Sequence, residues 1–187
     1  MFEDLKAYAK ENKVPIIQDG GFEVLFSEIT KNGYKSCLEV GTAIGYSAIR
    51  MASLGVEVTT IERDPKMYAL ALENISKYKM EHMIEPIFMD ALEYTPSKKF
   101  DLIFIDAAKA QSIKFFERFS PFLNDGGEII VDNLSFHGLV GSEEKLSRSL
   151  RQLVTKIQRY IDWIKNNEEW DTTITDKGDG MSISRRK

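Results

Sequence analysis

The sequence predicts an α/β fold, in which a mostly parallel sheet carries helices on both faces and ends in an antiparallel hairpin. Three observations predict it. Short apolar or β-branched runs alternate with segments of helical period, as in successive βαβ units. The central runs SCLEV and FDLIFID are apolar almost throughout, which is typical of strands covered on both faces. The chain ends in two short strand-like runs around the turn signal KGDG.

The elements follow in order along the chain. Two helices are expected first, over residues 2–11 and 21–32, with DGG and NG as the breaks between elements. Parallel strands are then predicted for five runs: residues 36–40, 56–62, 84–89, 100–106 and 128–133. The helical segments between them are YSAIRMASL (46–54), PKMYALALENISKY (65–78) and SIKFFERFSPFL (112–123).

The last quarter of the chain differs from this alternation. A long amphipathic helix is predicted from residue 142 to 163, because apolar side chains recur at steps of three and four: Leu146, Leu150, Leu153, Ile157, Tyr160 and Ile164. Its polar side carries a stripe of cations around Gln152: Lys145, Arg148, Lys156 and Arg159. That stripe suits phosphate groups, and it equally suits the solvated face of a surface helix. The strands DTTIT and MSISR then form the hairpin.

Length and composition place the chain among soluble globular proteins. Its 187 residues predict one domain, with N-terminal helices over 1–34 and the core over 35–187. No apolar run reaches the ~20 residues of a membrane span, the N-terminus is no secretory signal, and the single Cys37 excludes an intrachain disulfide framework, so a cytoplasmic location is expected. The net charge of −4 argues against a general nucleic-acid binder, although residues 141–187 carry +2.

Three strand ends predict a nucleoside cofactor site. LEVGTAIGYS turns the first strand into a helix, and Gly41 and Gly45 permit close backbone approach there. The pattern is GxxxG, so it is no dinucleotide fingerprint, and a plain tight turn would also explain it. Glu62 ends the second strand, where a carboxylate can accept both hydroxyls of a ribose, and Asp90 ends the third, beside the expected base. Each acid taken alone also fits a solvated strand end, but ligands of open α/β sheets bind at this edge.

The next two strands end in oxygen ligands. FDLIFID ends in Asp106, and EIIVDN ends in Asp132 and Asn133. Two carboxylates and an amide favour Mg²⁺, with Ca²⁺ or Mn²⁺ possible, although Asp and Asn also cap strands without any metal. Lys109 follows three residues after Asp106 and is either a general base with a lowered pKa or a solvated loop lysine.

Taken together, several stretches resemble the cation-dependent O-methyltransferases that use S-adenosylmethionine, a family that includes the catechol and caffeoyl-CoA enzymes. The stretches are EVGTAIGYSAIRMA, TIERD, MDALE, FDLIFIDAAKAQ, GGEIIVDN and SFHGLVG. The likeness is greatest to the bacterial branch that methylates 5-hydroxyuridine at the wobble position of tRNA. It implies a Rossmann-like class I methyltransferase fold with seven strands in the order 3-2-1-4-5-7-6.

The resemblance also implies roles for individual residues. Asp106, Asp132 and Asn133 would ligate Mg²⁺, and Lys109 with Asp106 would be catalytic. The cofactor S-adenosylmethionine would be bound by the following residues: Ile17, Glu39, Gly41, Gly45, Ser47, Glu62, Asp90, Ala91 and Asp106. Members of the family usually carry a further helix before the segment that matches FEDLKAYAK.

The resulting hypothesis is a Mg²⁺-dependent homodimeric enzyme that moves a methyl group to a hydroxyl of tRNA near the anticodon, without membrane contact. Two alternatives stay open. One is an O-methyltransferase for small, catechol-like acceptors. The other, of a different class, is a non-catalytic cofactor- or RNA-binding module.

Overall fold

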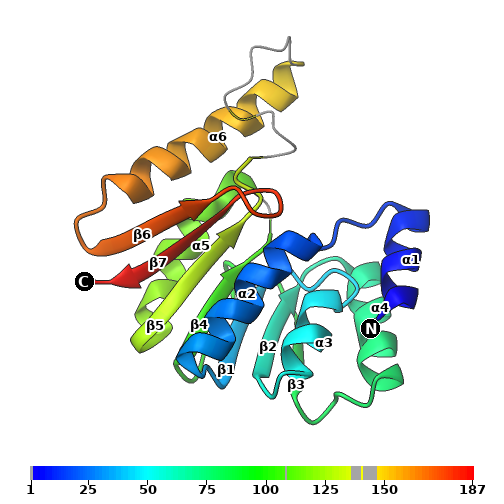
Figure 1. Cartoon of the computed structure of the whole chain (residues 1–187). Helices are drawn as coiled ribbons and strands as arrows, with labels where there is room; N and C mark the ends of the chain where they lie inside the picture. The colour runs from blue at the N-terminus through cyan, green and yellow to red at the C-terminus, as the bar shows by residue number, and fades with distance from the viewer. Residues whose placement is uncertain (1, 108, 136–139, 141–146) are drawn as a thin grey trace.

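A computed structural model of the chain describes residues 2–107, 109–135, 140 and 147–187 (Figure 1). Its centre is one seven-stranded sheet in the order β3-β2-β1-β4-β5-β7-β6, which confirms the predicted fold class and strand order. The strands are β1 (Ser36–Val40), β2 (Glu57–Glu62), β3 (Ile84–Phe88), β4 (Phe100–Ile105), β5 (Leu123–Asp132), β6 (Trp170–Thr175) and β7 (Met181–Arg186). β1 to β5 pair in parallel, and β7 pairs antiparallel with both β5 and β6.

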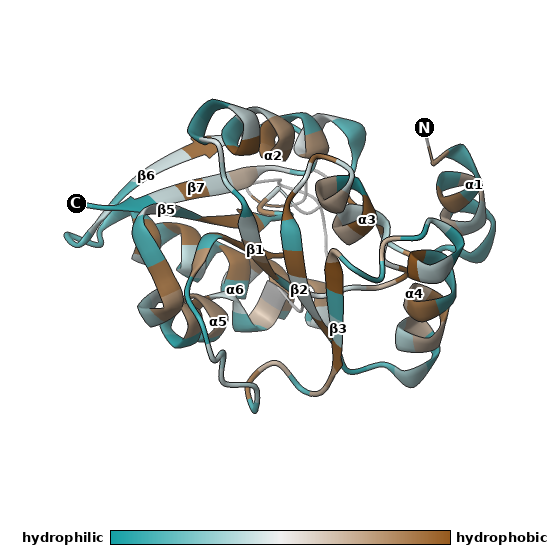
Figure 2. Cartoon of the chain, turned by 90° about the horizontal axis from the view of Figure 1, so that it is seen from below, coloured by the Kyte–Doolittle hydropathy of each residue, from teal (hydrophilic) through white to brown (hydrophobic). Residues whose placement is uncertain are grey.

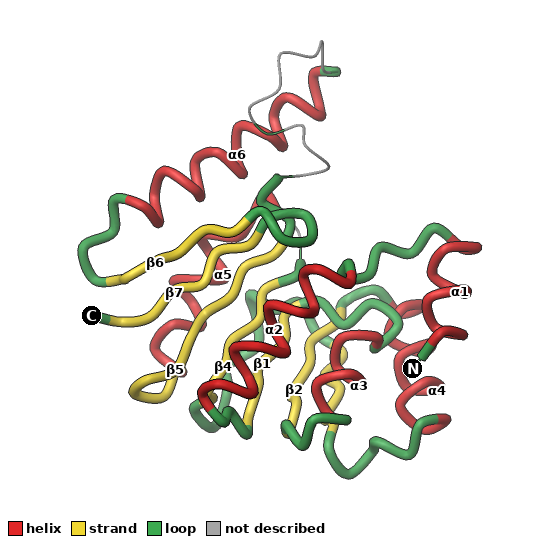
Figure 3. Tube along the Cα trace, in the orientation of Figure 1, coloured by secondary structure: helices red, strands yellow, loops and turns green. Residues whose placement is uncertain are grey.

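The helices lie on both faces of the sheet (Figure 3). They are α1 (Glu3–Asn12), α2 (Asp19–Asn32), α3 (Tyr46–Ala52), α4 (Pro65–Lys77), α5 (Ser112–Phe119) and α6 (Arg148–Lys165). Two short 3₁₀ helices, η1 (Lys109–Gln111) and η2 (Ser120–Phe122), flank α5. In the part of the chain that the structure describes, no helix combines the length and the apolar character needed to cross a membrane.

The boundary between α5 and β5 differs from the sequence prediction by several residues, for a local reason. α5 ends at Phe119 instead of Leu123, because Pro121 has no backbone N–H to continue the α-helical hydrogen bonds, and the chain goes on as the 3₁₀ helix η2. β5 therefore begins at Leu123, five residues before the predicted start. α6 is described from Arg148, after Ser147, whose hydroxyl caps the helix by accepting from the backbone N–H of Leu150 at 3.3 Å.

The strand register brings the chemistry-bearing residues to one edge. Val40 is paired with Ile61 on one side and with Ile105 on the other, and Ile105 is paired with Val131. The residues that follow these positions therefore leave the sheet together, at the carboxyl ends of the parallel strands. Between β1 and β4 the strand order reverses direction, which is where open α/β sheets bind ligands.

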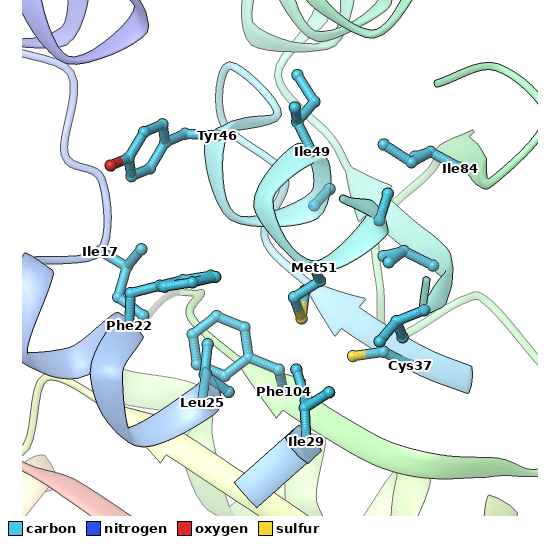
Figure 4. Packing of buried hydrophobic residues seen from close by; sticks show 14 of the residues in the cluster. Ile17, Phe22, Leu25, Ile29, Cys37, Tyr46, Ile49, Met51, Ile84 and Phe104 are labelled. Carbon is cyan, nitrogen blue, oxygen red and sulfur yellow. The ribbon is translucent and has the colours of Figure 1, made fainter. Parts of the chain in front are cut away.

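Alternating side chains divide the interior into two cores, one on each face of the sheet. The first packs residues of α1 to α4 against one face; Figure 4 shows Phe22, Leu25, Met51 and Phe104 pointing toward one another within it. The second packs α5 and α6 against the other face, around Phe116, Tyr160 and Trp170. Figure 2 shows hydrophobic brown stretches in the strands of the sheet and hydrophilic teal stretches on the helices around it. Because strands in the middle of the sheet are covered on both faces, their tips are held in place from both sides.

Candidate active site

A cavity of about 380 Å³ lies at the carboxyl ends of the strands. Its floor comes from the residues that follow β1, β2, β3 and β4, and its wall from the segment Val14–Ile17 between α1 and α2. Seven of the predicted cofactor residues line it: Ile17, Gly41, Ser47, Glu62, Asp90, Ala91 and Asp106. Apolar side chains such as Met67, Met89 and Phe115 complete the lining, so the cavity suits a ligand with an apolar body and a few polar groups.

Glu62 is fixed by backbone donors at the end of β2. Its Oε1 accepts from the N–H groups of Arg63 and Asp64 at 2.9 and 2.8 Å, and its Oε2 accepts from Ala43 at 2.9 Å. A carboxylate has about four acceptor positions, so capacity remains for a hydroxyl donor. The glycine loop and the tip of β2 are thus joined through this one side chain, in the place where a ribose would lie.

Asp90 lies at the mouth of the cavity in an ion pair. Its Oδ2 accepts from Arg63 Nη1 at 3.2 Å, and its Oδ1 accepts from the backbone N–H of Leu92 at 2.9 Å. The Leu92 hydrogen bond and the Arg63 guanidinium lower the pKa of Asp90 below its usual value, against a smaller effect of burial. Asp90 is therefore an anion at neutral pH, as a partner of base amino groups should be.

Glu39 and Gly45 are the two predicted cofactor residues that stand outside the lining. Glu39 is completely buried behind the cavity wall. Its Oε2 accepts from Thr60 Oγ1 at 2.5 Å, and Thr60 Oγ1 lies 2.6 Å from Thr42 Oγ1, which belongs to the lining. Gly45 adopts φ +81° directly before α3, a backbone conformation that favours glycine.

Burial gives Glu39 an unusual charge state. Loss of water raises the pKa of its carboxyl to about 8, while hydrogen bonds from Ser47 and Thr60 lower it and the nearby Asp106 and Glu62 raise it further. Glu39 is therefore mostly protonated at neutral pH. Its Oε1 is buried and accepts no hydrogen bond from the residues that the structure describes.

Gly41 serves packing as well as the ligand. At φ +102° its missing side chain leaves room for the next strand, since a Cβ there would lie 2.3 Å from the carbonyl oxygen of Asp106. The β4 tip thus closes onto the glycine loop, and the backbone N–H of Asp106 donates to the carbonyl of Val40 at 3.0 Å. Asp106 is thereby fixed beside the cofactor cavity.

The structure brings the predicted metal ligands together. Asn133 Nδ2 donates to Asp106 Oδ1 at 2.8 Å, and the backbone N–H of Asn133 donates to Asp132 Oδ1 at 2.6 Å. Asp132 is buried, and Asn133 has φ +68°, a left-handed conformation that Asn tolerates better than most residues. The described residues include no cluster of three His, Cys, Asp or Glu side chains, so the candidate set is two carboxylates and an amide. Oxygen donors of this kind fit Mg²⁺.

The turn between β6 and β7 supports the Asn133 loop from behind. The carbonyls of Asp179 and Gly180 accept from the backbone N–H groups of Ser135 and Leu134 at 2.7 and 2.9 Å. Gly180 has no room for a side chain, since a Cβ would lie 2.5 Å from Ser135 Oγ. The same turn meets the start of α2, where a Cβ on Gly178 would lie 2.8 Å from the backbone nitrogen of Gly21.

Lys109, the predicted base, begins η1 three residues after Asp106, and its side chain lies outside the described residues. Its catalytic role stays a prediction. Ser47 lies in the first turn of α3 with its side chain against the cavity and Glu39.

Comparison with known proteins agrees with this geometry. The family model described as O-methyltransferase matches residues 3–187. The chain belongs to the O-methyltransferase family. Its enzyme class is that of the S-adenosylmethionine-dependent O-methyltransferases, as the sequence resemblance predicted.

Individual relatives cover most of the chain. A candidate caffeoyl-CoA O-methyltransferase of Staphylococcus aureus superimposes with a TM-score of 0.94 at 39% identity, over 99% of this chain and 91% of its own. The Bacillus cereus O-methyltransferase in complex with SAH gives a TM-score of 0.81 at 25% identity, over 99% and 90%. The caffeoyl-CoA O-methyltransferase of Populus kitakamiensis is 29% identical over 164 residues, which are 81% of this chain and 70% of that protein.

Several lining residues of this O-methyltransferase were missed by sequence reasoning. Of the wall segment Val14–Ile17 only Ile17 was predicted, and the place of the other three residues at the cavity follows from the fold. Arg63 gave a usable signal, because it directly follows Glu62 at the strand tip. Thr60, which lies behind the lining between Thr42 and Glu39, gave no signal, because a threonine inside a strand is ordinary sheet composition.

Proposed function

We propose that the protein is a divalent-cation-dependent O-methyltransferase whose acceptor is a hydroxyl group. One observation carries the proposal: Asp106 belongs to two sites at once. It lines the cofactor cavity, and it accepts a hydrogen bond from the Asn133 amide beside Asp132. A methyl donor and a cation held by these residues would therefore be neighbours, as methyl transfer to a cation-activated hydroxyl requires.

When bound, S-adenosylmethionine supplies a methyl group on a positively charged sulfur, and Mg²⁺ supplies a Lewis acid that favours the ionised form of an acceptor hydroxyl. The chain's residues divide the remaining work. Glu62 and Asp90 would orient the nucleoside half of the donor, and Asp106, Asp132 and Asn133 would hold the cation. The apolar wall from Val14 to Ile17 excludes water from the cavity, which strengthens electrostatic interactions there. Lys109 is the proposed base that takes the acceptor proton.

For the acceptor we propose 5-hydroxyuridine in the anticodon region of tRNA. The proposal rests on the resemblance of the motifs to the bacterial tRNA branch. The charge of α6 supports it: this helix carries five Lys and Arg side chains and one acid, in a chain whose net charge is −4. A polyanionic acceptor would meet this helix favourably.

A second acceptor class is favoured by the comparisons. The relative from Populus kitakamiensis is named for caffeoyl-CoA, whose aromatic ring carries neighbouring hydroxyls. A catechol-like molecule offers two oxygens to one cation, which also fits a site of two carboxylates and one amide. We therefore treat small vicinal diols on aromatic rings as the second candidate.

The deciding experiment measures transfer of labelled methyl from S-adenosylmethionine to two acceptors, with Mg²⁺ and with a chelator. One acceptor is tRNA from cells of the source organism that lack this gene, and the other is a catechol. We expect label in tRNA only with Mg²⁺. Label in the catechol alone would select the second candidate, and transfer that survives the chelator would refute the cation requirement.

Asp106→Asn tests the shared residue. It keeps the size of the side chain and removes the charge, so we expect transfer to fall at least 10³-fold, on the order expected when a principal electrostatic group is lost. Asp125→Asn removes a carboxylate from an exposed position near the start of β5 and should leave transfer unchanged. Calorimetric titration of the Asp106→Asn protein with Mg²⁺ should show loss of binding. Retained Mg²⁺ binding would assign the cation to other residues.

A further inference from the structure

α6 has two unlike sides. Ile157, Tyr160 and Ile164 are buried against the second core, and Leu153 and Trp163 pack partly against it. On the opposite side, exposed polar residues recur at steps of four, three and four: Arg148, Gln152, Thr155 and Arg159. Arg151 and Lys156 flank this row, and these six residues line one open hollow of the surface. We call them the basic row.

The basic row is a local concentration of positive charge. α6 contains five cations and only Asp162 as an acid, and Asp162 Oδ1 is occupied by a hydrogen bond from Gln158 at 2.8 Å. Among the described residues no acid pairs with Arg148, Lys156 or Arg159. Some cations elsewhere in the described chain pair with acids, as Lys6 does with Asp19, Lys77 with Asp4 and Arg63 with Asp90, and many do not. What distinguishes α6 is its density of cations, five within 18 residues. Charge that the fold leaves uncompensated is available to an anionic partner.

The helix that carries the row packs against elements next to the candidate active site. α6 packs against η1, the turn that begins three residues after Asp106, and against α5. Figure 1 shows the first turns of α6 extending past the carboxyl ends of the strands, the edge where the cavity opens. From Arg148 to Arg159 the row spans eleven helical steps, or roughly 16 Å, which is the length of several nucleotides of one strand.

We propose that the basic row binds the phosphate backbone of an RNA acceptor and holds it against the active site. This inference rests on the proposed function, because it identifies how the same site would take a tRNA. Arginine and lysine side chains on one helix side give contacts that position a nucleic acid without reading its bases. Gln152 and Thr155, between the cations, add hydrogen-bond donors of the kind that meet phosphate oxygens.

The test compares two triple variants of equal charge. Arg148→Gln, Lys156→Gln and Arg159→Gln together remove three of the four charges of the row, while Lys10→Gln, Lys35→Gln and Lys79→Gln together remove the same charge from exposed sites elsewhere in the chain. Binding of unmodified tRNA is measured by fluorescence anisotropy at several salt concentrations, and methyl transfer to tRNA is measured in parallel. Titration with S-adenosylhomocysteine and thermal melting check that both variants are folded.

We expect the row variant to bind tRNA on the order of 100-fold more weakly at 0.15 M salt, with a shallower salt dependence, and the control variant to match the wild type within about threefold. Equal weakening of both variants would show that only net charge matters, and would overturn the inference. A wild type that methylates tRNA with the row variant unaffected would overturn it while leaving the proposed function intact.

The remaining outcomes separate the two proposals further. RNA binding through the row without methyl transfer would keep the inference and reject tRNA as the acceptor. Absence of RNA binding by the wild type would overturn the inference, whatever acceptor is found. Row-dependent binding to phosphatidylglycerol vesicles without binding to tRNA would assign the row to a membrane surface and overturn the inference as stated.

Discussion

A glutamate is buried near each end of the sheet, and the two side chains have different partners. Glu39 lies toward the carboxyl ends of the strands and Glu128 toward the amino ends, and both side chains face the core formed with α1 to α4. Glu128 receives the Arg185 guanidinium, whose Nε donates to Glu128 Oε1 at 2.5 Å. Glu39 receives hydroxyl groups and no cation among the described residues.

The glutamate at the amino end helps to hold the fold together, whereas the glutamate at the carboxyl end lies beside the candidate active site. At the amino end, Arg185 also reaches Asn32 Oδ1 at 3.0 Å and Glu28 Oε2 at 3.4 Å, so the cluster ties β5 and β7 to the end of α2. Burial raises the pKa of Glu128, and the guanidinium opposes that rise. At the carboxyl end, no cation among the described residues opposes burial, and Glu39 stays largely protonated beside the cavity that would bind a positively charged cofactor. A buried acid without a counter-ion is the costly arrangement, and it occurs next to the active site.

The largest predicted effect is the pH dependence of Glu39→Gln. The folded pKa of about 8 lies above the ordinary value of 4.5, so between these values the unfolded chain has lost a proton that the folded protein keeps. Wild-type stability therefore falls as pH rises from about 4.5 to 8, and the loss stays constant above that. Glutamine does not titrate. From pH 5 to pH 9 the variant should gain roughly 4 kcal/mol relative to the wild type, measured by urea unfolding.

Glu128→Gln is the matched control for that measurement. The same substitution at the amino end removes the carboxylate from Arg185, so it should destabilise the protein at neutral pH. If Glu39→Gln and Glu128→Gln changed the free energy of unfolding in the same direction, the comparison between the two ends would fail.

Arg185→Ala should have the next largest effect. It leaves the Glu128 carboxylate buried without its cation, which costs about 3 kcal/mol because water reaches the vacated position only partly. Arg186→Ala is the neighbouring control, since Arg186 is exposed and only covers the Trp170 ring at 5.1 Å, a contact of about 0.5–1 kcal/mol. Chemical denaturation of both variants gives the two values. Equal losses would mean that the buried pair is no stronger than a surface contact.

Gly180→Ala tests whether the turn between β6 and β7 positions the Asn133 loop, which carries two of the candidate metal ligands. The new Cβ would collide with Ser135, so we expect a loss of about 2 kcal/mol in stability and at least tenfold weaker Mg²⁺ binding, with cofactor affinity less affected. Gly126→Ala is the matched control: Gly126 has φ +78°, close to the +79° of Gly180, but its Cβ would meet nothing within 4 Å. The control should show only the backbone strain, about 1 kcal/mol. Equal Mg²⁺ affinity in the two variants would remove the turn between β6 and β7 from the site.

Asp4→Asn should have the smallest effect. Asp4 accepts hydrogen bonds from Lys77 and Tyr78, and these partners lower its pKa to about 2, but the group is largely exposed. The interaction holds α1 against α4, next to the segment that walls the cavity. Solvent screening limits the stability loss to a few tenths of a kcal/mol. Hydrogen exchange of α1 should quicken, and unchanged exchange would show that the apolar contacts of Leu5 and Ala9 hold the helix alone.

The prediction from sequence succeeded where one local signal had one physical meaning. Apolar runs ending in Glu62, Asp90, Asp106 and Asp132 marked strand tips, and a parallel sheet brings strand tips to one edge. The prediction was incomplete for residues whose role depends on a neighbour in space that is distant in sequence. Glu39 belongs to the motif, but its place behind Ser47 and Thr42 follows from the packing of α3 and β2.

The sequence by itself determined the alternation of elements, the terminal hairpin and the set of oxygen ligands, because hydrophobic period and strand-end acids are local properties. Tertiary structure alone decided that Asn133 meets Asp106 and that the turn at Gly180 supports that contact. It also decided that Glu128 has a cation beside it, while Glu39 has none within the part of the chain that the structure describes. These facts depend on which distant strands become neighbours, and the pairing of β1 with β4 and of β5 with β7 is a property of the whole sheet. Charge state follows from that pairing, since the same side chain has a different pKa beside an arginine than beside two hydroxyls.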